Sequence, residues 1–212
     1  MNKNANATYH LRPLRKTDIA TVSGWFESLD DLSLFDRTMR VPVNHEAVEK
    51  SLLDAAGIEG AVGKCWFAIE AERDSLNGIV GLENINPING DAILALFIEH
   101  DSRNKGIGIR TSALILDMAF NQLRLNRVSS FYRADNKASR KLTTAAGFQE
   151  EGCLRKAWFS GGSHMDMICV GLLQSEWAKR RQELVAELSA GPRVTFGHKS
   201  SGGWSWPPMN LV

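Results

Sequence analysis

Cysteine is scarce in this sequence of 212 residues, and the cysteines that are present are not paired. Cys65, Cys153 and Cys169 are isolated and odd in number, and no Cys-x-x-Cys pair occurs. The five histidines have no metal-ligand spacing with cysteine or acidic residues. A disulfide framework and a zinc site are therefore not expected, and we predict reduced thiols, no bound metal and a cytoplasmic protein.

The sequence also lacks an excess of either charge and any long apolar run. Lys and Arg number 25 against 24 for Asp and Glu, whereas a protein that binds nucleic acid or an anionic membrane usually has a basic excess. The longest wholly apolar run, residues 92–98, is far too short to span a bilayer, and residues 1–10 lack the apolar segment of a signal peptide. We expect neither a nucleic-acid partner nor a membrane.

The composition that remains fits one globular domain. A hydrophobic fraction of 43% and a charged fraction of 23% are ordinary for such a domain, and 212 residues are too few for two comfortable ones. We place the domain at residues 1–189 and a tail rich in Gly, Ser and Pro at 190–212. Trp204 and Trp206 in this tail favour docking on its own domain or on a second subunit, so a homodimer stays an open alternative.

Hydrophobic periodicity and turn residues predict alternating elements along the chain. Strands are expected at residues 9–14, 65–71, 76–85, 92–98, 128–133, 148–159 and 165–173. Helices are expected after residue 17, after residue 44, and at 107–124, 136–146 and 175–188. This order predicts a mixed α+β fold in which helices cover both faces of one sheet.

The loop between the expected strand at 92–98 and the helix at 107–124 carries the strongest chemical signal. A helix start offers unpaired backbone N–H groups and the positive end of the helix dipole, a natural seat for a pyrophosphate. The loop glycines let the backbone approach phosphate oxygens closely. Residues 106–111 read Gly-Ile-Gly-Ile-Arg-Thr, which matches neither a P-loop nor a dinucleotide-binding loop. A plain strand-to-helix turn is the alternative. The loop itself reads Arg103-Asn104-Lys105-Gly106-Ile107-Gly108.

Two later segments favour a specific family. An asparagine opens a short helix that ends in Gly-Phe, at Asn136 and Gly147-Phe148, and residues 150–155 read Glu-Glu-Gly-Cys-Leu-Arg. With the Arg-x-x-Gly-x-Gly pattern of the loop, these motifs resemble the GNAT acyltransferase superfamily over roughly residues 9–178. The ribosomal-protein serine/alanine N-terminal acetyltransferases are the most similar subgroup, because Asn136-x-x-Ser139 and Gly-x-x-His-x-Asp at 161–166 also match.

The resemblance implies a fold, a cosubstrate and a set of binding residues. The fold would be a central, mostly antiparallel twisted sheet of about seven strands, splayed between strands 4 and 5. Backbone N–H groups of residues 103–108 would hold the pyrophosphate of acetyl-CoA. The splayed strand would pair with the pantetheine arm around Phe97 and Ile98, and Asn136 and Ser139 would contact the same arm. For Asn136, an N-cap of the following helix is the alternative role.

Acyl transfer to an amine needs an acid for the thiolate and a base for the ammonium. By resemblance, Ser139 is the acid, whereas Thr143 stands where many relatives have tyrosine. Trp158 stands where the ribosomal-protein enzymes have a glutamate that acts as the general base. The part of the site that binds the acceptor therefore differs from theirs. We rank Glu83 first and His164 second as replacement bases. A solvent-facing Glu83 and a water chain without a single base are the alternatives.

These residues leave three functions open. The first is acetylation of a primary amine on a small molecule, by direct attack in a ternary complex. The second is acetylation of a protein N-terminus or lysine. The third is a CoA-binding regulatory module without catalysis. Trp158 and Thr143 favour the third function, whereas Ser139 and the pyrophosphate loop favour an enzyme.

Overall fold

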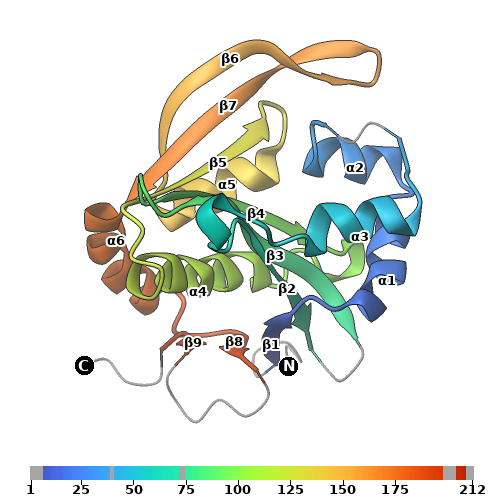
Figure 1. The fold of residues 1–212 in the computed structure, drawn as a ribbon. Coiled ribbons are helices and arrows are strands. Elements are labelled where there is room, and N and C mark those ends of the chain that lie inside the picture. Colours follow the sequence, from blue (N-terminus) through green and yellow to red (C-terminus); the bar gives the residue numbers. More distant parts are fainter. Residues whose placement is uncertain (1–6, 39–40, 72–74, 198–203, 209–212) are drawn as a thin grey trace.

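The strands of the protein form one mixed sheet (Figure 1). The computed structural model describes residues 7–38, 41–71, 75–197 and 204–208. In this part of the chain the strand order is β6-β7-β5-β4-β3-β2-β1-β8-β9. The predicted mixed sheet is confirmed, and it gains two strands from the C-terminal segment. The strands are β1 (Thr8–Pro13), β2 (Cys65–Glu70), β3 (Leu76–Asn86), β4 (Asp91–Ile98), β5 (Arg127–Arg133), β6 (Gln149–Ser160), β7 (Ser163–Leu173), β8 (Arg193–Phe196) and β9 (Ser205–Trp206).

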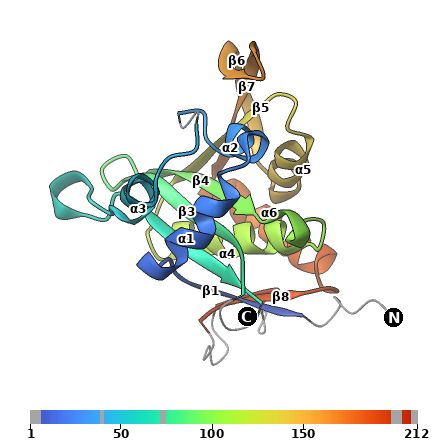
Figure 2. The same ribbon diagram turned by 90° about the vertical axis from the view of Figure 1, so that its right-hand side faces the viewer.

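Helices cover both faces of the sheet, as predicted (Figures 1 and 2). Two apolar cores result, one between the sheet and the N-terminal helices and one between the sheet and the later helices. Among the described residues, no helix combines the length and the apolar character needed to cross a membrane. The N-terminal helices are α1 (Ile19–Trp25), α2 (Leu29–Phe35) and α3 (His45–Leu53), and the later ones are α4 (Ile107–Asn121), α5 (Lys137–Ala146) and α6 (Gln174–Glu187).

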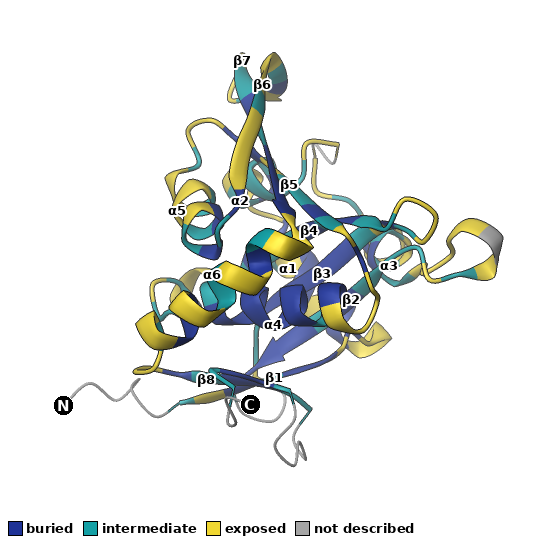
Figure 3. Cartoon of the chain, turned by 90° about the vertical axis from the view of Figure 1, so that its left-hand side faces the viewer, coloured by how far each residue is buried: buried dark blue, intermediate teal, exposed yellow. Residues whose placement is uncertain are grey.

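Helix α4 is buried along most of its length, because apolar side chains cover more than one of its faces. It contacts the sheet strands β3, β4 and β5, the helices α5 and α6, and the C-terminal strands β8 and β9. Figure 3 shows α4 as largely buried, whereas the outer side of α6 is exposed. A helix enclosed on so many sides holds its first turn in a fixed position next to β4.

The C-terminal segment is part of the sheet. Strand β8 pairs in parallel with β1, and β9 pairs antiparallel with β8. Trp206 is fully buried, and its indole N–H donates to Asp117 of α4 at 2.8 Å. Trp204 packs against the same core. Residues 198–203 and 209–212 of the predicted tail lie outside the described residues, and docking on a second subunit stays a prediction.

The sheet opens between β4 and β5. Residues 91–93 of β4 pair in parallel with residues 127–129 of β5, and the pairing of the two strands ends there. Beyond that point β4 continues antiparallel to β3 as far as Ile98, and β5 continues antiparallel to β7 as far as Arg133. The predicted splay is therefore present, and it connects the face covered by α4 and α5 with the face covered by α1–α3.

Candidate active site at the strand splay

The backbone of β4 is open along the splay. The carbonyl of Leu94 accepts from Ser130 Oγ at 3.0 Å, and the carbonyl of Ile98 accepts from Arg103 Nε at 2.9 Å. Both carbonyls therefore point away from β3, and Leu96, two residues from each, points the same way by strand alternation. No strand of the described part of the chain pairs with this edge beyond residue 93. An extended ligand laid along β4 would meet the backbone of Leu96 and Ile98.

The side chain of Phe97 is buried on the α1–α3 face of the sheet and is not part of this open edge. Its side chain is 6% exposed and packs at ring-centroid distances of 5.4 Å from Trp25, 5.3 Å from Phe26 and 5.7 Å from Phe35. Of the two β4 residues predicted to bind the pantetheine arm, Ile98 lies at the open edge. The side chain of Phe97 belongs instead to the core below α1 and α2. Trp66 adjoins this cluster, 6.0 Å from Phe35.

The loop before α4 has the backbone that an anion site requires. Gly106 is the N-cap of α4 and has φ of 75°, in the left-handed region that favours glycine. Asn104 is also left-handed, with φ of 61°. The first turn of α4 leaves the N–H groups of Ile107 and Gly108 without helical acceptors, and half-buried Lys105 adds a positive charge beside them. The loop can therefore seat a pyrophosphate through its backbone.

Arg103 does not bring its charge to the start of α4, and its backbone N–H donates to the carbonyl of His100 at 3.2 Å. Its guanidinium donates to the carbonyl of Ile98, forms an ion pair with Asp31 of α2 at 2.7 Å and lies 5.4 Å from the centre of the Phe97 ring. These contacts turn the side chain inward, away from the start of α4. Arg103 thereby fixes the end of β4 to α2.

Gly108 packs closely against two leucine side chains, so we expect Gly108→Val to displace the first turn of α4 and weaken CoA binding. A Cβ atom at this position would lie 3.1 Å from Leu142 and 3.4 Å from Leu96. Overpacking of this kind costs about 1–3 kcal/mol, which corresponds to a loss of affinity of about fivefold to a hundredfold. Calorimetric titration with CoA measures the effect. The control is Gly152→Val, where a Cβ atom meets nothing within 4 Å. Equal affinities for the two variants would contradict the prediction.

The start of α5 presents one occupied and one available polar group. Asn136 caps the helix, because its Oδ1 accepts from the N–H of Ser139 at 3.0 Å. The capping role weighed for Asn136 is therefore real, and its amide N–H groups still have no partner among the described residues. Ser139 is half-buried, and its Oγ makes no hydrogen bond within the described part of the chain. By contrast, the hydroxyl of Thr143 donates to the carbonyl of Ser139 at 3.0 Å, so Ser139 carries the available hydroxyl.

Glu83 lies on the opposite face of the sheet from α5. Ile79 of the same strand belongs to the core below α1–α3, and strand alternation puts Glu83 on that face. The register with β4 shifts directly after Glu83, where Asn84 has φ of 50°, a bulge of the kind that re-aims side chains beside functional sites. The half-buried carboxyl group is therefore directed towards the acceptor side of the splay.

The surroundings of Glu83 raise the pKa of its carboxyl group above the ordinary glutamate range. Burial is the largest cause, and the nearby carboxylate of Asp36 raises the pKa further, while Lys64 and the indole of Trp66 oppose the change. The buried N–H of Trp66 makes no hydrogen bond of normal geometry within the described residues, so its effect on Glu83 is that of a nearby dipole. A carboxylate with a raised pKa is a better proton acceptor near neutrality.

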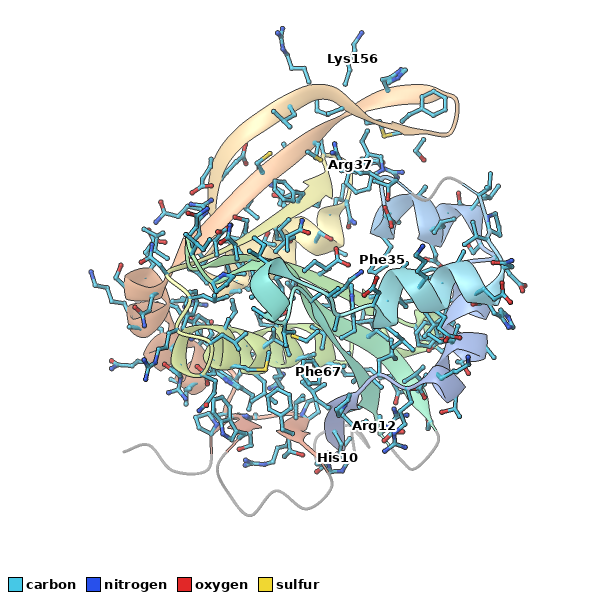
Figure 4. All side chains as sticks on the ribbon, in the orientation of Figure 1. His10, Arg12, Phe35, Arg37, Phe67 and Lys156 are labelled. Atoms are coloured by element: carbon cyan, nitrogen blue, oxygen red, sulfur yellow. The ribbon has the colours of Figure 1, made fainter. Side chains whose placement is uncertain are left out.

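Helix α2 is held over the splay from two directions. The carbonyl of Ser33 accepts from the indole N–H of Trp158 at 2.9 Å, and its Oγ accepts from Arg133 at 3.1 Å. Figure 4 shows Phe35 on the side of α2 towards the sheet and Arg37 beneath the β6–β7 hairpin. Trp158 is 3% exposed, so it ties the hairpin to α2 instead of lining an open pocket. This connection places Asp36, the C-cap of α2, close to Glu83.

His164 is remote from the other predicted catalytic residues. It is exposed near the end of the β6–β7 hairpin, where its ring packs edge-to-face against Phe159 at 4.9 Å. Figure 1 shows this hairpin above the rest of the sheet. No contact within the described part of the chain links it to Ser139 or Glu83. No group of three His, Cys, Asp or Glu side chains in the same part is placed to hold a metal ion.

Sequence reasoning missed Asp36, Ser130 and Phe131. Asp36 follows α2, and only the tertiary position of that helix brings it to Glu83. Ser130 closes the paired part of the splay through its bond to Leu94. Phe131, on β5 just beyond, is 40% exposed although it lies within a strand, and it offers an apolar surface at the mouth of the splay.

The geometry agrees with comparisons to known proteins. A family model described as the acetyltransferase (GNAT) domain matches residues 9–149, and the chain belongs to this family. The putative ribosomal N-acetyltransferase YdaF of Bacillus subtilis (strain 168) is 33% identical over 103 residues, which are 49% of this chain and 56% of that protein. The spermidine N(1)-acetyltransferase of Vibrio cholerae is 28% identical over 116 residues, 55% of this chain and 67% of that protein.

Solved structures share the fold. The crystal structure of spermidine N-acetyltransferase from Vibrio cholerae in complex with CoA and spermine has a TM-score of 0.71 at 23% identity, covering 80% of this chain and 98% of that one. The predicted acetyltransferase family is confirmed by the family model, and the predicted fold is confirmed by the family model and the solved structure. The acceptor and the roles of individual site residues stay predictions.

Proposed function

We propose that the protein transfers the acetyl group of acetyl-CoA to the primary amine of a small molecule, by direct attack in a ternary complex. The observation that carries the proposal is the pair of carboxylates, Glu83 and Asp36, on the acceptor side of the splay. An ammonium group is attracted by two nearby carboxylates, and the one with the raised pKa can accept its proton. The similarity to spermidine N-acetyltransferases supports an amine of this kind.

The splay lets the two substrates approach from opposite faces of the sheet. The pyrophosphate loop and the start of α5 lie on the α4–α5 face, where acetyl-CoA would enter and its pantetheine arm would follow the open edge of β4. The half-buried Glu83 lies on the α1–α3 face, below the clamped helix α2. An acetyl group in the gap would therefore meet an amine that arrives from the other side.

Each step of the transfer has a candidate group in this arrangement. Glu83 takes a proton from the ammonium, and the free amine attacks the thioester carbonyl, whose oxygen the backbone N–H groups of open β4 can polarise. The C–N bond forms as the C–S bond breaks. Ser139 Oγ then gives a proton to the departing CoA thiolate and regains one, through solvent, from the nitrogen, which loses its second proton as it becomes the amide. The products are the N-acetylated amine, CoA and protonated Glu83.

A thiol-release assay with acetyl-CoA tests the acceptor class. The panel contains spermidine, an amino sugar and a peptide with an N-terminal serine. We expect release with the small amines and none above background with the peptide. Turnover confined to the peptide would contradict the proposal and favour acetylation of protein N-termini, the second candidate, which the Asn136-x-x-Ser139 motif and the similarity to YdaF support. Tight CoA binding without any turnover would favour the regulatory module.

Ser139→Ala is expected to lower kcat about a hundredfold while the affinity for acetyl-CoA stays within about twofold, because general acid catalysis contributes at least that much. The backbone N–H of residue 139 still reaches Asn136 in this variant, so the start of α5 is preserved. Steady-state kinetics and CoA titration separate the two quantities. The matched control is Thr143→Val, which removes a hydroxyl that bonds only to its own helix. Similar kcat values for both variants would rule out an acid role for Ser139.

A further inference from the structure

Arg110 is a buried cation in the first turn of α4 that the acetyl-transfer steps do not use. Arg110 as a whole is only 4% exposed. Nη1 donates to the carbonyl of Gly106 at 3.1 Å, and Nη2 donates to the carbonyls of Leu188, at 3.0 Å, and Ala190. No carboxylate pairs with it in the described part of the chain, and burial lowers the pKa of the guanidinium. Its positive charge therefore remains unneutralised close to the helix start.

The bond to Gly106 stabilises the direction of the neighbouring N–H group. The carbonyl of Gly106 and the N–H of Ile107 belong to one planar trans peptide unit, so they point in opposite directions. Because Arg110 holds the carbonyl towards the helix, the N–H of Ile107 points out of the helix start, where a pyrophosphate would sit. A buried, unpaired cation behind the loop also adds to the positive potential at that point.

Two glycines that are far apart in the sequence enclose the guanidinium. A Cβ atom at Gly106 would lie 2.8 Å from Nη1, and one at Gly191 would lie 2.8 Å from Nη2. Both glycines have positive φ, 75° and 110°. The segment at 188–191, which leads from α6 into β8, therefore packs directly against the group that supports the loop.

We propose that Arg110 is a positioning residue for the CoA pyrophosphate, and that the C-terminal segment at 188–191 holds it in place and so sets the affinity for CoA. This inference rests on the proposed role of residues 103–108 as the pyrophosphate loop. It assigns a donor-site function to a segment at least 80 residues along the chain from that loop.

The first test compares Arg110→Met and Arg110→Lys. Loss of the charged hydrogen bonds in Arg110→Met is expected to raise the Kd for CoA roughly tenfold or more, with kcat at saturating acetyl-CoA within about twofold. Arg110→Lys keeps the charge and fewer donors, so it should recover part of the affinity. Calorimetry gives Kd, and steady-state kinetics divide the effect between KM and kcat. An unchanged Kd in Arg110→Met would overturn the proposal.

The second test uses S-acetylpantetheine, which lacks the pyrophosphate. Arg110→Met should leave kcat/KM for this donor at the wild-type value while lowering kcat/KM for acetyl-CoA. An equal loss with both donors would show a general structural role and overturn the inference alone. If the wild-type enzyme did not distinguish the two donors, the pyrophosphate loop itself would be wrongly assigned, and the proposed donor site would fail with it.

A matched pair of tail variants keeps the proposal testable if Arg110→Met does not fold. Gly191→Ala brings a Cβ atom against Arg110 and should weaken CoA binding roughly fivefold or more, as a close contact in a packed site does. Gly197→Ala also has a positive φ, 67° against 110° at Gly191, but meets nothing within 4 Å, so it carries a smaller backbone strain without the contact. Equal CoA affinities for the two variants would overturn the link between tail and loop.

Discussion

Replacement of Asp117 by alanine is expected to lower the free energy of unfolding by about 3–5 kcal/mol, the usual consequence of removing one partner from a buried charged network. Asp117 is 4% exposed. Its two oxygens accept from the indole N–H groups of Trp177, at 3.0 Å, and Trp206, at 2.8 Å, and from Arg181. Alanine would leave both buried indoles without an acceptor, and each unpaired donor costs about 1–3 kcal/mol.

Two controls divide this effect between the tryptophans and the ion pair. Arg181→Met removes a cation whose side chain is 31% exposed and leaves the buried carboxylate of Asp117 bonded to both indoles, so its loss should be smaller than that of Asp117→Ala. Asp117→Asn keeps the shape and one acceptor oxygen, so its loss should lie between those of the other two variants. Urea unfolding followed by tryptophan fluorescence measures all three. A loss in Arg181→Met as large as that in Asp117→Ala would show that the ion pair, not the indoles, stabilises the tail.

Local signals made the donor half of the site predictable. The apolar run at 92–98 and the glycines after it sufficed to place a strand, a loop and a helix start, because each depends on residues a few positions apart. Asn136 likewise caps a helix through a bond to Ser139, three residues further on, and Gly147 ends that helix with φ of 93°. Such features follow from backbone propensities, which a sequence displays directly.

The C-terminal strands depend on contacts that no local pattern displays. Trp206 reaches Asp117 across 89 positions of the chain. The two tryptophans of the tail indicated docking, but nothing nearby in sequence indicated that residues 193–196 would pair in parallel with β1. The parallel pairing adds an edge to the sheet through long-range packing alone.

The acceptor half was only partly predictable, for a related reason. Glu83 could be named as a carboxylate in a strand beside the splay, but its partner Asp36 lies 47 positions away. The substitution at Trp158 was visible in the sequence, whereas its consequence was not. Only the folded chain shows that its indole N–H binds the carbonyl of Ser33 and so holds α2 over the splay.

Glu83→Gln is expected to lower kcat by about a hundredfold or more, because it removes the group that we propose takes the ammonium proton. A base must be ionised to act, so kcat/KM of the wild-type enzyme should rise with pH through the pKa of Glu83. Because burial and Asp36 raise that pKa, this rise should lie at higher pH than for an ordinary glutamate. Glu83→Gln should lose the rise altogether. A raised KM with an unchanged kcat would instead indicate that Glu83 only binds the amine.

Substitutions of two charged neighbours of Glu83 should shift the pH profile of kcat/KM in opposite directions. Asp36→Asn removes a negative charge that raises the pKa of Glu83, so the rise in kcat/KM should shift to lower pH. Lys64→Met removes a positive charge that lowers the same pKa, so the rise should shift to higher pH. Both profiles are measured with acetyl-CoA saturating and the amine varied. Neither substitution touches the donor loop, so the affinity for CoA should stay constant. Shifts in the same direction, or none, would assign the ionisation to another group and leave Glu83 without its role as the base.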